Sequence, residues 1–434
     1  MKNAMQIIRT SDSRYRQKLA ALDRTASPSP ALTKTVASIL KAVSKDGDPA
    51  LIRLTKKFGG PLLRPDQLFV PATEVVRARQ AAGPEVLAAI RAAKRNVSAF
   101  ARRSLRKSWF RKNAQGAIVG ERFDPLERVG VYVPGGTAPL VSTAIMTCGI
   151  AQAAGVREIV AATPAGPDGS VHPALLTALA ECGATEIYRV GGAQAVAAMA
   201  YGTRSIRPVQ KIFGPGNAYV VEAKRQVFGR VAVDLLPGPS EVLVIADATA
   251  KASWVAADLL AQCEHGHGSA GVLVTDSVKL IGAVEKEIVR QMKLSGRPKE
   301  LALGLAGTTL VQVPDMDSAI DLANRYAAEH VSVATRSPGA IAGRLTTSGA
   351  IFLGAITPVA AGDFLAGPSH ELPTGGAAKS FAGLTADQFQ RRTSVVMMDE
   401  KSLRNSLPVI ETFARIEGLD AHARSASIRV RRSS

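Results

Sequence analysis

Histidine is rare in this chain, and most of the histidines stand beside other residues that can bind a metal ion or move a proton. Four of the 6 histidines lie in such segments: His265, His330, His370 and His422. Imidazole titrates near neutral pH and is a common nitrogen ligand of zinc. These segments are therefore the first candidates for a catalytic or metal-binding site.

The segment AQCEHG places Gln262 and His265 three residues apart at the predicted end of a helix. Residues three apart share one helix face, so an amide oxygen and an imidazole nitrogen can address one ion, whereas Glu264 points elsewhere. The alternative is a histidine that only caps the helix or lies on the surface. The pair predicts a metal site if other segments supply further ligands.

Glu329 and His330 are adjacent in YAAEHVSVA, where an amphipathic helix is predicted to end and a strand to begin. A neighbouring carboxylate and imidazole suit general acid/base catalysis, because burial raises the pKa of glutamate toward neutrality, where histidine titrates. A solvated helix terminus is the alternative interpretation. We expect this pair to project into a cleft.

Two more polar segments lie farther along the chain. Asp363, Ser369 and His370 lie in VAAGDFLAGPSHELPTGG, directly after the apolar run AIFLG, and loops that follow strands often carry function. A carboxylate there would complete a mixed nitrogen and oxygen shell suited to zinc or manganese. Glu417 and His422 stand five residues apart in RIEGLDAHARS.

The elements that must position these side chains follow from the spacing of apolar residues. Roughly the first 120 residues are predicted to be mainly helical, with apolar residues such as Val36, Ile39, Leu40 and Val43 at helical spacing. From Arg128 onward, short β-branched runs alternate with helical stretches, which is typical of βαβ units and an α/β fold with mostly parallel sheets. The runs are VGVYV, REIVAAT, EIYRV, KIFGP, VAVDLL, EVLVIA, GVLVTD, TTLVQV, HVSVAT and AIFLG. We expect ligands at the carboxyl ends of these strands and a helical segment from about residue 384 onward.

The pattern GxGxxG occurs as GHGSAG at residues 266–271 and would suggest a dinucleotide site. Such a site needs a strand before the motif and a helix after it, so that the pyrophosphate meets a helix N-terminus. Here SWVAADLLAQCEHG reads as a helix that enters the motif, and GVLVTDS reads as a strand that leaves it. We therefore reject this motif as a dinucleotide site.

Composition narrows the cellular setting and the partners. The net charge is +18, but the basic residues are scattered and no RNA-binding aromatic motif accompanies them, so we expect no nucleic-acid partner. The uncharged run 129–156 is interrupted by proline and glycine, so we expect no membrane span, and the N-terminus has no apolar signal region, which predicts a cytoplasmic location. The three cysteines are widely spaced and are expected to be buried apolar residues: Cys148, Cys182 and Cys263.

Taken together, the polar segments resemble those of the histidinol dehydrogenase family. AQCEHG, AAEHV, GDFLAGPSHELPTGG and EGLDAH occur in the family's order and at comparable spacing. Further matching blocks cover the chain from about residue 35 to 430. They are YVPGGTAP (132–139), GGAQAVAAMAYGT (191–203), FGPGNAYVVEAKR (213–225) and DLLPGPSEVLVIAD (234–247).

The resemblance implies a division of labour among the polar residues. Gln262, His265, Asp363 and His422 correspond to the ligands of one zinc ion per subunit, with His422 reaching in from the partner subunit of a domain-swapped homodimer. These four ligands also belong to the substrate-binding set.

Other positions carry over in the same way. Glu329 and His330 correspond to the catalytic pair, and Glu329 also faces the substrate. Ser240, His370 and Glu417 correspond to substrate-contacting positions, and the positions that contact NAD correspond to Tyr132, Gln194 and Asn217.

The resemblance also implies two Rossmann-like α/β domains with mostly parallel sheets and small helical segments at both ends. Residues 1–24 would form the N-terminal helical segment, residues 25–131 and 242–384 the zinc and catalytic domain, and residues 132–241 the NAD-contacting domain. Residues 385–434 would form a C-terminal helical segment that contributes to the partner's active site.

The implied reaction is the four-electron oxidation of L-histidinol through L-histidinal to L-histidine in histidine biosynthesis, with zinc and NAD. Ser369 stands where the family usually has asparagine, which leaves a related dehydrogenase for another small alcohol, such as a sulfonated diol, as an alternative. Glu417 favours histidinol, because a carboxylate suits a cationic amino alcohol and not a sulfonate. A zinc hydrolase that uses Glu329 to activate water, without NAD, is a further alternative.

Overall fold

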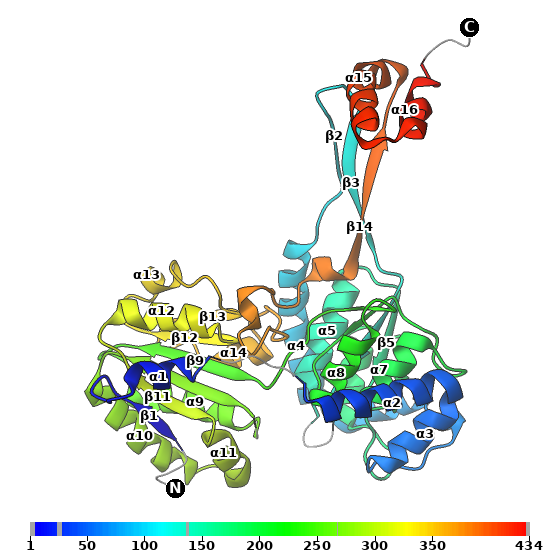
Figure 1. Ribbon diagram of the computed structural model, residues 1–434. Coiled ribbons are helices and arrows are strands. Elements are labelled where there is room, and N and C mark those ends of the chain that lie inside the picture. The colour runs from blue at the N-terminus through cyan, green and yellow to red at the C-terminus, as the bar shows by residue number, and fades with distance from the viewer. Residues whose placement is uncertain (1–4, 24–27, 136–138, 267, 431–434) are drawn as a thin grey trace.

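The computed structural model describes residues 5–23, 28–135, 139–266 and 268–430. Its body consists of two α/β units, each built on a parallel sheet, and an arm projects from the body (Figure 1). The predicted α/β class with two Rossmann-like units is confirmed. All ten strands predicted after residue 128 are present.

The first unit contains a five-stranded parallel sheet in the order β6-β5-β4-β7-β8. Its strands are β4 (Arg128–Tyr132), β5 (Glu158–Ala162), β6 (Glu186–Tyr188), β7 (Lys211–Phe213) and β8 (Ala232–Val233). This is the order of a mononucleotide-binding half, in which the crevice forms where the strand order reverses, here between β4 and β7. Helices α4 (Ala72–Ala101), α5 (Val141–Ala153) and α6 (Pro173–Glu181) cover one face. Helices α2 (Pro30–Asp46), α3 (Asp48–Lys57), α7 (Gly192–Tyr201) and α8 (Ala218–Val227) cover the other.

The packing of α2, α3 and α4 differs from the expected division of the chain. We grouped residues 25–131 with residues 242–384, but the apolar faces of these helices pack on the five-stranded sheet. Val36 and Leu40 of α2 share a core with α7, and Ile90 of α4 shares a core with α5 and α6. Helical periodicity shows which face is buried but does not show which sheet covers it.

The second unit contains a six-stranded parallel sheet in the order β1-β11-β10-β9-β12-β13. Its strands are β1 (Gln6–Ile8), β9 (Glu241–Ala246), β10 (Ala270–Thr275), β11 (Thr308–Gln312), β12 (His330–Ala334) and β13 (Ala350–Leu353). One face carries α9 (Ala252–Cys263), α10 (Val278–Met292) and α11 (Pro298–Leu305). The other carries α1 (Tyr15–Ala20), α12 (Met316–Tyr326) and α13 (Pro338–Ala342). The N-terminal segment, predicted as helical, thus supplies an edge strand as well as a helix.

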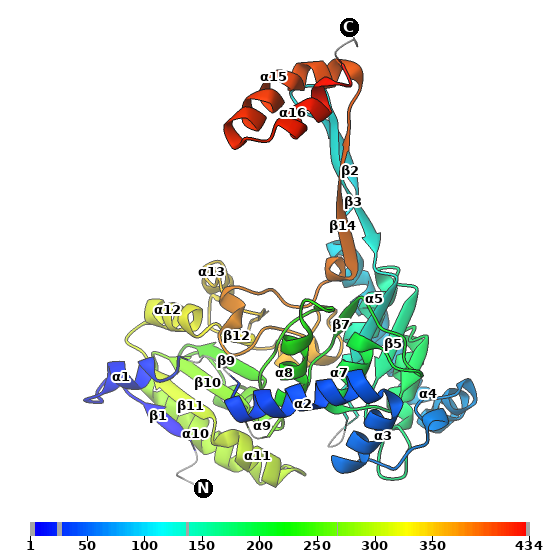
Figure 2. The ribbon, with the colours of Figure 1, turned by 45° about the vertical axis from the view of Figure 1, so that its right-hand side comes forward.

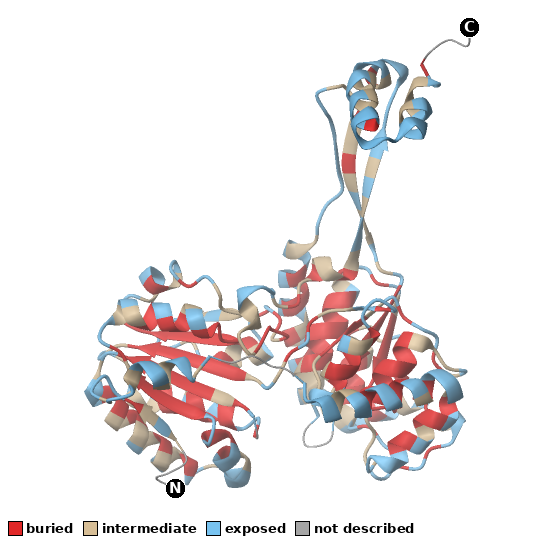
Figure 3. Cartoon of the chain, viewed as in Figure 1, coloured by how far each residue is buried: buried red, intermediate tan, exposed pale blue. Residues whose placement is uncertain are grey.

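The arm is a three-stranded antiparallel sheet that ends in two helices and stands away from the body in both views (Figures 1 and 2). Its elements are β2 (Trp109–Lys112), β3 (Ile118–Pro125), β14 (Gln390–Met397), α15 (Glu400–Glu417) and α16 (Asp420–Ser427). The prediction of mainly helical structure was wrong for the strands within residues 109–120 and for the start of the C-terminal segment. Much of the arm's surface is exposed (Figure 3), so its strands lack the buried apolar runs by which strands were recognised.

The remaining elements complete the chain. Helix α14 (Val359–Phe364) follows β13, and short 3-10 helices occupy Pro65–Gln67, Arg102–Ser104, Ala377–Lys379 and Ala386–Phe389. The GHGSAG segment lies between α9 and β10, as its rejection as a dinucleotide motif required, although His267 falls outside the described residues. Across the described ranges, we find no helix with the length and apolarity to cross a membrane.

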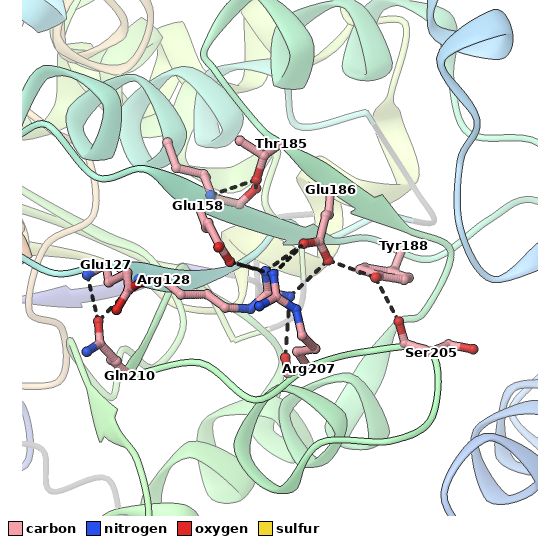
Figure 4. Close-up of polar contacts among 10 residues, drawn as sticks. Glu127, Arg128, Glu158, Thr185, Glu186, Tyr188, Ser205, Arg207 and Gln210 are labelled. Carbon is pink, nitrogen blue, oxygen red and sulfur yellow. Dashed lines mark hydrogen bonds and ion pairs between the residues drawn. The ribbon is translucent and has the colours of Figure 1, made fainter.

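A cluster of ion pairs closes the amino ends of the five-stranded sheet (Figure 4). Arg128, which opens β4, lies 2.6 Å from carboxylate oxygens of both Glu158 and Glu186, the first residues of β5 and β6. Arg207 approaches Glu158 at 2.7 Å, and the Tyr188 hydroxyl donates to Glu186 at 2.8 Å. The Arg128 side chain is 7% exposed, so the cluster neutralises a buried charge and ties three strands together.

Candidate active site

The acid/base pair lies where β12 begins. Glu329 immediately precedes the strand, and His330, its first residue, is in register with Val242 of β9 and Ala350 of β13. These side chains therefore lie at the amino ends of the six-stranded sheet, whereas we expected ligands at the carboxyl ends. The difference arises because Glu329 and His265 stand in helix-to-strand connections, whereas Asp363 and His370 follow the edge strand β13.

Glu329 is held by groups that precede and open β9. Its Oε2 accepts hydrogen bonds from the Ser240 hydroxyl at 2.6 Å and from the Glu241 backbone N–H at 2.8 Å. Burial raises the pKa of Glu329 well above its ordinary value, although these two hydrogen bonds oppose the shift. Glu329 is thus a strong base for a carboxylate, fixed in one orientation.

The imidazole ring of His330 contacts the same segment through Nδ1. Its Nδ1 lies 3.3 Å from the Glu241 carbonyl oxygen, which can only accept, so Nδ1 carries the proton and Nε2 presents a lone pair. Nε2 has no hydrogen-bond partner in the described structure and lies 3.5 Å from Asp363 Oδ1. Burial lowers the pKa of His330 to about 4, so the ring is neutral near pH 7 and Nε2 can accept a proton.

Two of the four residues expected to bind zinc, His265 and Asp363, lie beside this pair, and a third, Gln262, lies on α9, the helix that leads to His265. Gln262 ends up buried near the end of α9, and its amide nitrogen has no hydrogen-bond partner among the described residues. His265 lies just beyond α9, where burial lowers its pKa, and it is close enough to interact electrostatically with His330 and His370. Burial raises the pKa of Asp363, on α14, to about 6.

These residues do not form a complete metal site by themselves. In the described part of the chain, no three His, Cys, Asp or Glu side chains are grouped so that they could hold a metal ion. A buried amide, an imidazole and a carboxylate nevertheless provide nitrogen and oxygen donors of the kind that zinc accepts. The donor set fits zinc if a further ligand comes from outside this group.

His370 lies in the loop that follows α14. Burial lowers its pKa to about 4, and its Nδ1 lies 3.4 Å from Oε1 of Glu371. Burial also raises the pKa of Glu371 to about 8, with the nearby carboxylate of Asp234 adding to the shift. The loop therefore brings a neutral imidazole and a buried carboxyl group to the edge of the site.

Glu417 and His422 are not part of this cluster. Glu417 ends α15 and His422 lies in α16, both exposed at the tip of the arm and away from the body (Figures 1 and 2). Within one chain, the structure thus separates these two residues from the other expected site residues.

The three residues expected to contact NAD line one cavity of about 400 Å³ in the five-stranded unit. Tyr132 ends β4 and accepts a hydrogen bond from Gly192 N–H at 3.1 Å, Gln194 lies in the first turn of α7, and Asn217 caps α8. The described lining contains no charged side chain. This cavity lies at the carboxyl ends of the strands, as expected for this sheet.

Glycine is required at one point in the wall of this cavity. A Cβ on Gly191 would lie 2.6 Å from Pro164 Cβ, so only glycine fits between β6 and the turn after β5. Residues 136–138, which belong to the matching block YVPGGTAP, lie outside the described residues.

Sequence reasoning missed Glu241, which is fully buried and contacts both members of the acid/base pair. A signal was present, because a single acidic residue opens the otherwise apolar run EVLVIA. A buried carboxylate is costly unless it has specific partners, so such a position merits attention.

Comparison with known proteins agrees with the geometry. The sequence pattern of the family described as histidinol dehydrogenase matches residues 22–430. A histidinol dehydrogenase of Heliobacterium mobile is 46% identical over 396 residues, which cover 91% of this chain and 93% of that protein. One of Geobacillus kaustophilus (strain HTA426) is 44% identical over 398 residues, or 92% of this chain and 93% of that protein.

The fold agrees over the same extent. The crystal structure of histidinol dehydrogenase from Elizabethkingia anophelis superposes with a TM-score of 0.92 at 33% identity and covers 98% of both chains. The resemblance drawn from the motifs is confirmed, and the comparisons give no support to the alternative of a dehydrogenase for a sulfonated diol. The chain belongs to the histidinol dehydrogenase family of oxidoreductases.

Proposed function

We propose that this enzyme oxidises L-histidinol through L-histidinal to L-histidine, with two NAD and one water consumed in each cycle. The observation that carries the proposal is the buried pair of Glu329 and His330, in which one group is a strengthened base and the other presents a free lone pair. The family assignment supplies the substrate.

When bound, zinc would supply a cation that orients the amine and imidazole of the substrate, and NAD would supply the hydride acceptor for each oxidation. Gln262, His265 and Asp363 would hold the zinc ion together with His422 of the partner subunit. The chemistry of the donors supports this assignment, because the buried amide of Gln262 carries an oxygen that can bind a cation, beside an imidazole and a carboxylate.

His330 would accept the hydroxyl proton of the alcohol at Nε2 as hydride leaves the same carbon. Its hydrogen bond from Nδ1 to the Glu241 carbonyl keeps Nε2 unprotonated and fixes the ring. A neutral ring near pH 7 is the form that this step needs, and its lowered pKa ensures that form.

Glu329 would then act in the second oxidation. We assign it the activation of the water that adds to the aldehyde, after which His330 takes the proton of the hydrate as the second hydride leaves. Ser240 and the Glu241 N–H hold the carboxylate in place for this step. The buried setting also protects the aldehyde from side reactions between the two oxidations.

The cavity beside Tyr132, Gln194 and Asn217 would receive NAD. Helices α7 and α8 both begin at this cavity, and helix N-termini favour the negative charge of a pyrophosphate. An uncharged lining suits the nicotinamide and adenine rings. This mode needs no GxGxxG motif.

We propose that the active enzyme is a homodimer in which the arm completes the partner's site. Exposed apolar side chains on α15 and just after α16 support this arrangement, because several of them on one small projection indicate a surface that another chain covers. They are Val409, Phe413, Ile416 and Ile428. The partner's Glu417 would face the substrate amine, which explains why a carboxylate suits that position.

The predicted cytoplasmic location fits the cysteines, which are buried and not joined in disulfides. The absence of a nucleic-acid partner stays a prediction that salt-dependent DNA binding would contradict.

A substrate panel with NADH absorbance at 340 nm tests the proposed function. The zinc-loaded enzyme should reduce NAD with L-histidinol and with L-histidinal, and far more slowly with small diols. Failure to form NADH from L-histidinol at neutral and alkaline pH would contradict the assignment and favour a zinc hydrolase.

A further inference from the structure

Glu241 occupies an unusual position for a carboxylate. It opens β9, next to β12 in the six-stranded sheet, and its side chain is fully buried. Burying a carboxylate is costly unless hydrogen bonds compensate it. The hydrogen bonds of Glu241 therefore indicate its role in the structure.

The main chain and the side chain of Glu241 serve different partners. The backbone N–H and carbonyl contact the Glu329 carboxylate and His330 Nδ1, and any amino acid at this position would keep those contacts. The side-chain Oε1 accepts hydrogen bonds from the backbone N–H groups of Gly375 at 2.9 Å and of Glu329 at 3.3 Å. The side chain thus joins a loop to the start of β12.

That loop, residues 365–384, contains His370 and has only a short 3-10 helix of its own. Gly375 lies five residues after His370, in a left-handed conformation at φ 63°. Its neighbour Thr374 accepts a short hydrogen bond from the Gly238 N–H, so two consecutive residues of the loop are fastened to the segment that leads into β9.

We infer that Glu241 is a positioning residue whose carboxylate fastens the His370 loop onto the strand end that carries Glu329 and His330. The inference rests on the proposed function in one respect, namely that His370 faces the substrate. Loss of the side chain should loosen the loop and weaken substrate binding, while the Glu329 carboxylate and His330 Nδ1 keep their contacts with the main chain of Glu241. The expected signature is a raised KM for L-histidinol with a nearly unchanged kcat.

Two substitutions separate the fastening from other roles of the residue. Glu241→Met keeps a similar volume but removes the acceptor, whereas Glu241→Gln keeps an amide oxygen that can accept both N–H groups. For the zinc-loaded full-length enzyme, we expect Met to raise the KM by about tenfold with kcat within about threefold, and Gln to restore the KM to near the original value.

Hydrogen exchange measured by mass spectrometry tests the loop directly. Peptides that contain Gly375 should exchange at least about tenfold faster in Glu241→Met than in the original enzyme, and Glu241→Gln should restore their protection. Unchanged exchange in the Met variant, or a Gln variant as loose as the Met variant, would overturn the inference. Faster exchange with an unchanged KM would support the fastening and contradict the placement of His370 at the substrate.

The original enzyme provides a check if the Met variant does not fold. Gly375 is partly exposed, so its amide should be protected from exchange only because it donates to Glu241. Exchange of this amide at the rate of an unstructured loop would overturn the inference without any variant.

Discussion

The amino ends of both parallel sheets carry titratable side chains in buried surroundings. In the five-stranded sheet these side chains form ion pairs, whereas in the six-stranded sheet burial shifts their pKa values toward the neutral forms. In the five-stranded sheet, Arg128 pairs with Glu158 and Glu186 and lowers the pKa of Glu186 to about 2. In the six-stranded sheet, burial raises the pKa of Glu329 and lowers that of His330, and neither side chain has a Lys or Arg ion-pair partner among the described residues. Paired ions join strands, whereas unpaired ones are left ready for chemistry.

Buried polar atoms without partners sharpen this contrast. Arg128 leaves its Nε without a hydrogen bond, but both terminal nitrogens are paired. His330 Nε2 and Gln262 Nε2 have no hydrogen-bond partner among the described residues, which costs about 1–3 kcal/mol for each group. Unpaired buried polar groups that carry this cost are explained if a bound ligand forms hydrogen bonds with them. The contrast between the two sheets leads to five predictions, which are given from the largest expected effect to the smallest.

The largest effect is expected at the catalytic pair. His330→Asn should lower kcat by about a thousandfold or more, because it removes the proton acceptor, and should leave the zinc content intact. His265→Asn should lose zinc as well as activity. Metal analysis of both purified variants checks the division of roles, and equal zinc loss in the two would contradict it.

The proposed dimer predicts recovery of activity from two inactive variants. In a hybrid of His330→Asn and His422→Asn subunits, one of the two sites has an intact His330 and receives an intact His422 from the partner. Random exchange should restore about one quarter of the original activity, since about half of the dimers are hybrids. No recovery, despite subunit exchange shown by mass spectrometry, would count against the swapped arm.

The ion cluster should matter for stability and not for turnover. Arg128→Met leaves two carboxylates without their buried partner and should destabilise the fold by about 3 kcal/mol, seen as a thermal midpoint lower by about 5 °C or more. Arg207→Ala is the matched control, because Arg207 is 66% exposed and should cost less than about 1 kcal/mol. Equal losses in the two variants would contradict the buried role of Arg128.

Asn217 combines a helix cap with a place in the cofactor cavity. Asn217→Ala should raise the KM for NAD and remove the cap of α8, at a cost of about 1 kcal/mol, because its Oδ1 accepts from the N–H groups of Tyr219 and Val220. Asn217→Ser should keep the cap and still raise the KM for NAD. If the serine variant binds NAD normally, the cap alone accounts for the residue.

Glu186 predicts a pH dependence of stability. Its pKa is lowered from 4.5 to about 2 in the folded state, chiefly by the Arg128 hydrogen bond, so its contribution is complete above the unfolded pKa and is lost as pH falls through about 4.5 toward 2. The difference in thermal midpoint between the original enzyme and Glu186→Gln should therefore shrink on acidification. A constant difference between about pH 6 and pH 3 would contradict the pairing.

The sequence predicted the parallel strands and singled out several of the polar residues that the structure brings together, for reasons that particular residues make clear. Strands such as EVLVIA are buried on both faces, so their composition marks them, and side chains such as His330 stand out because histidine is rare. The arm strands β3 and β14 are mostly half-buried or exposed and carry charges on both faces, so no pattern marked them. The role of Glu241 depends on a loop more than 130 residues away, and spacing along the chain does not contain that contact.

The most direct test compares kcat for L-histidinol in His330→Asn and Arg128→Met, in one NADH assay at a temperature where both are folded. Each substitution removes a buried polar residue from the amino end of a parallel strand. We predict a loss of about a thousandfold or more for His330→Asn and a kcat within about threefold of the original for Arg128→Met. Losses of similar size in both variants, or a nearly normal kcat in His330→Asn, would contradict the assignment of catalysis to the six-stranded sheet and of stability to the five-stranded one.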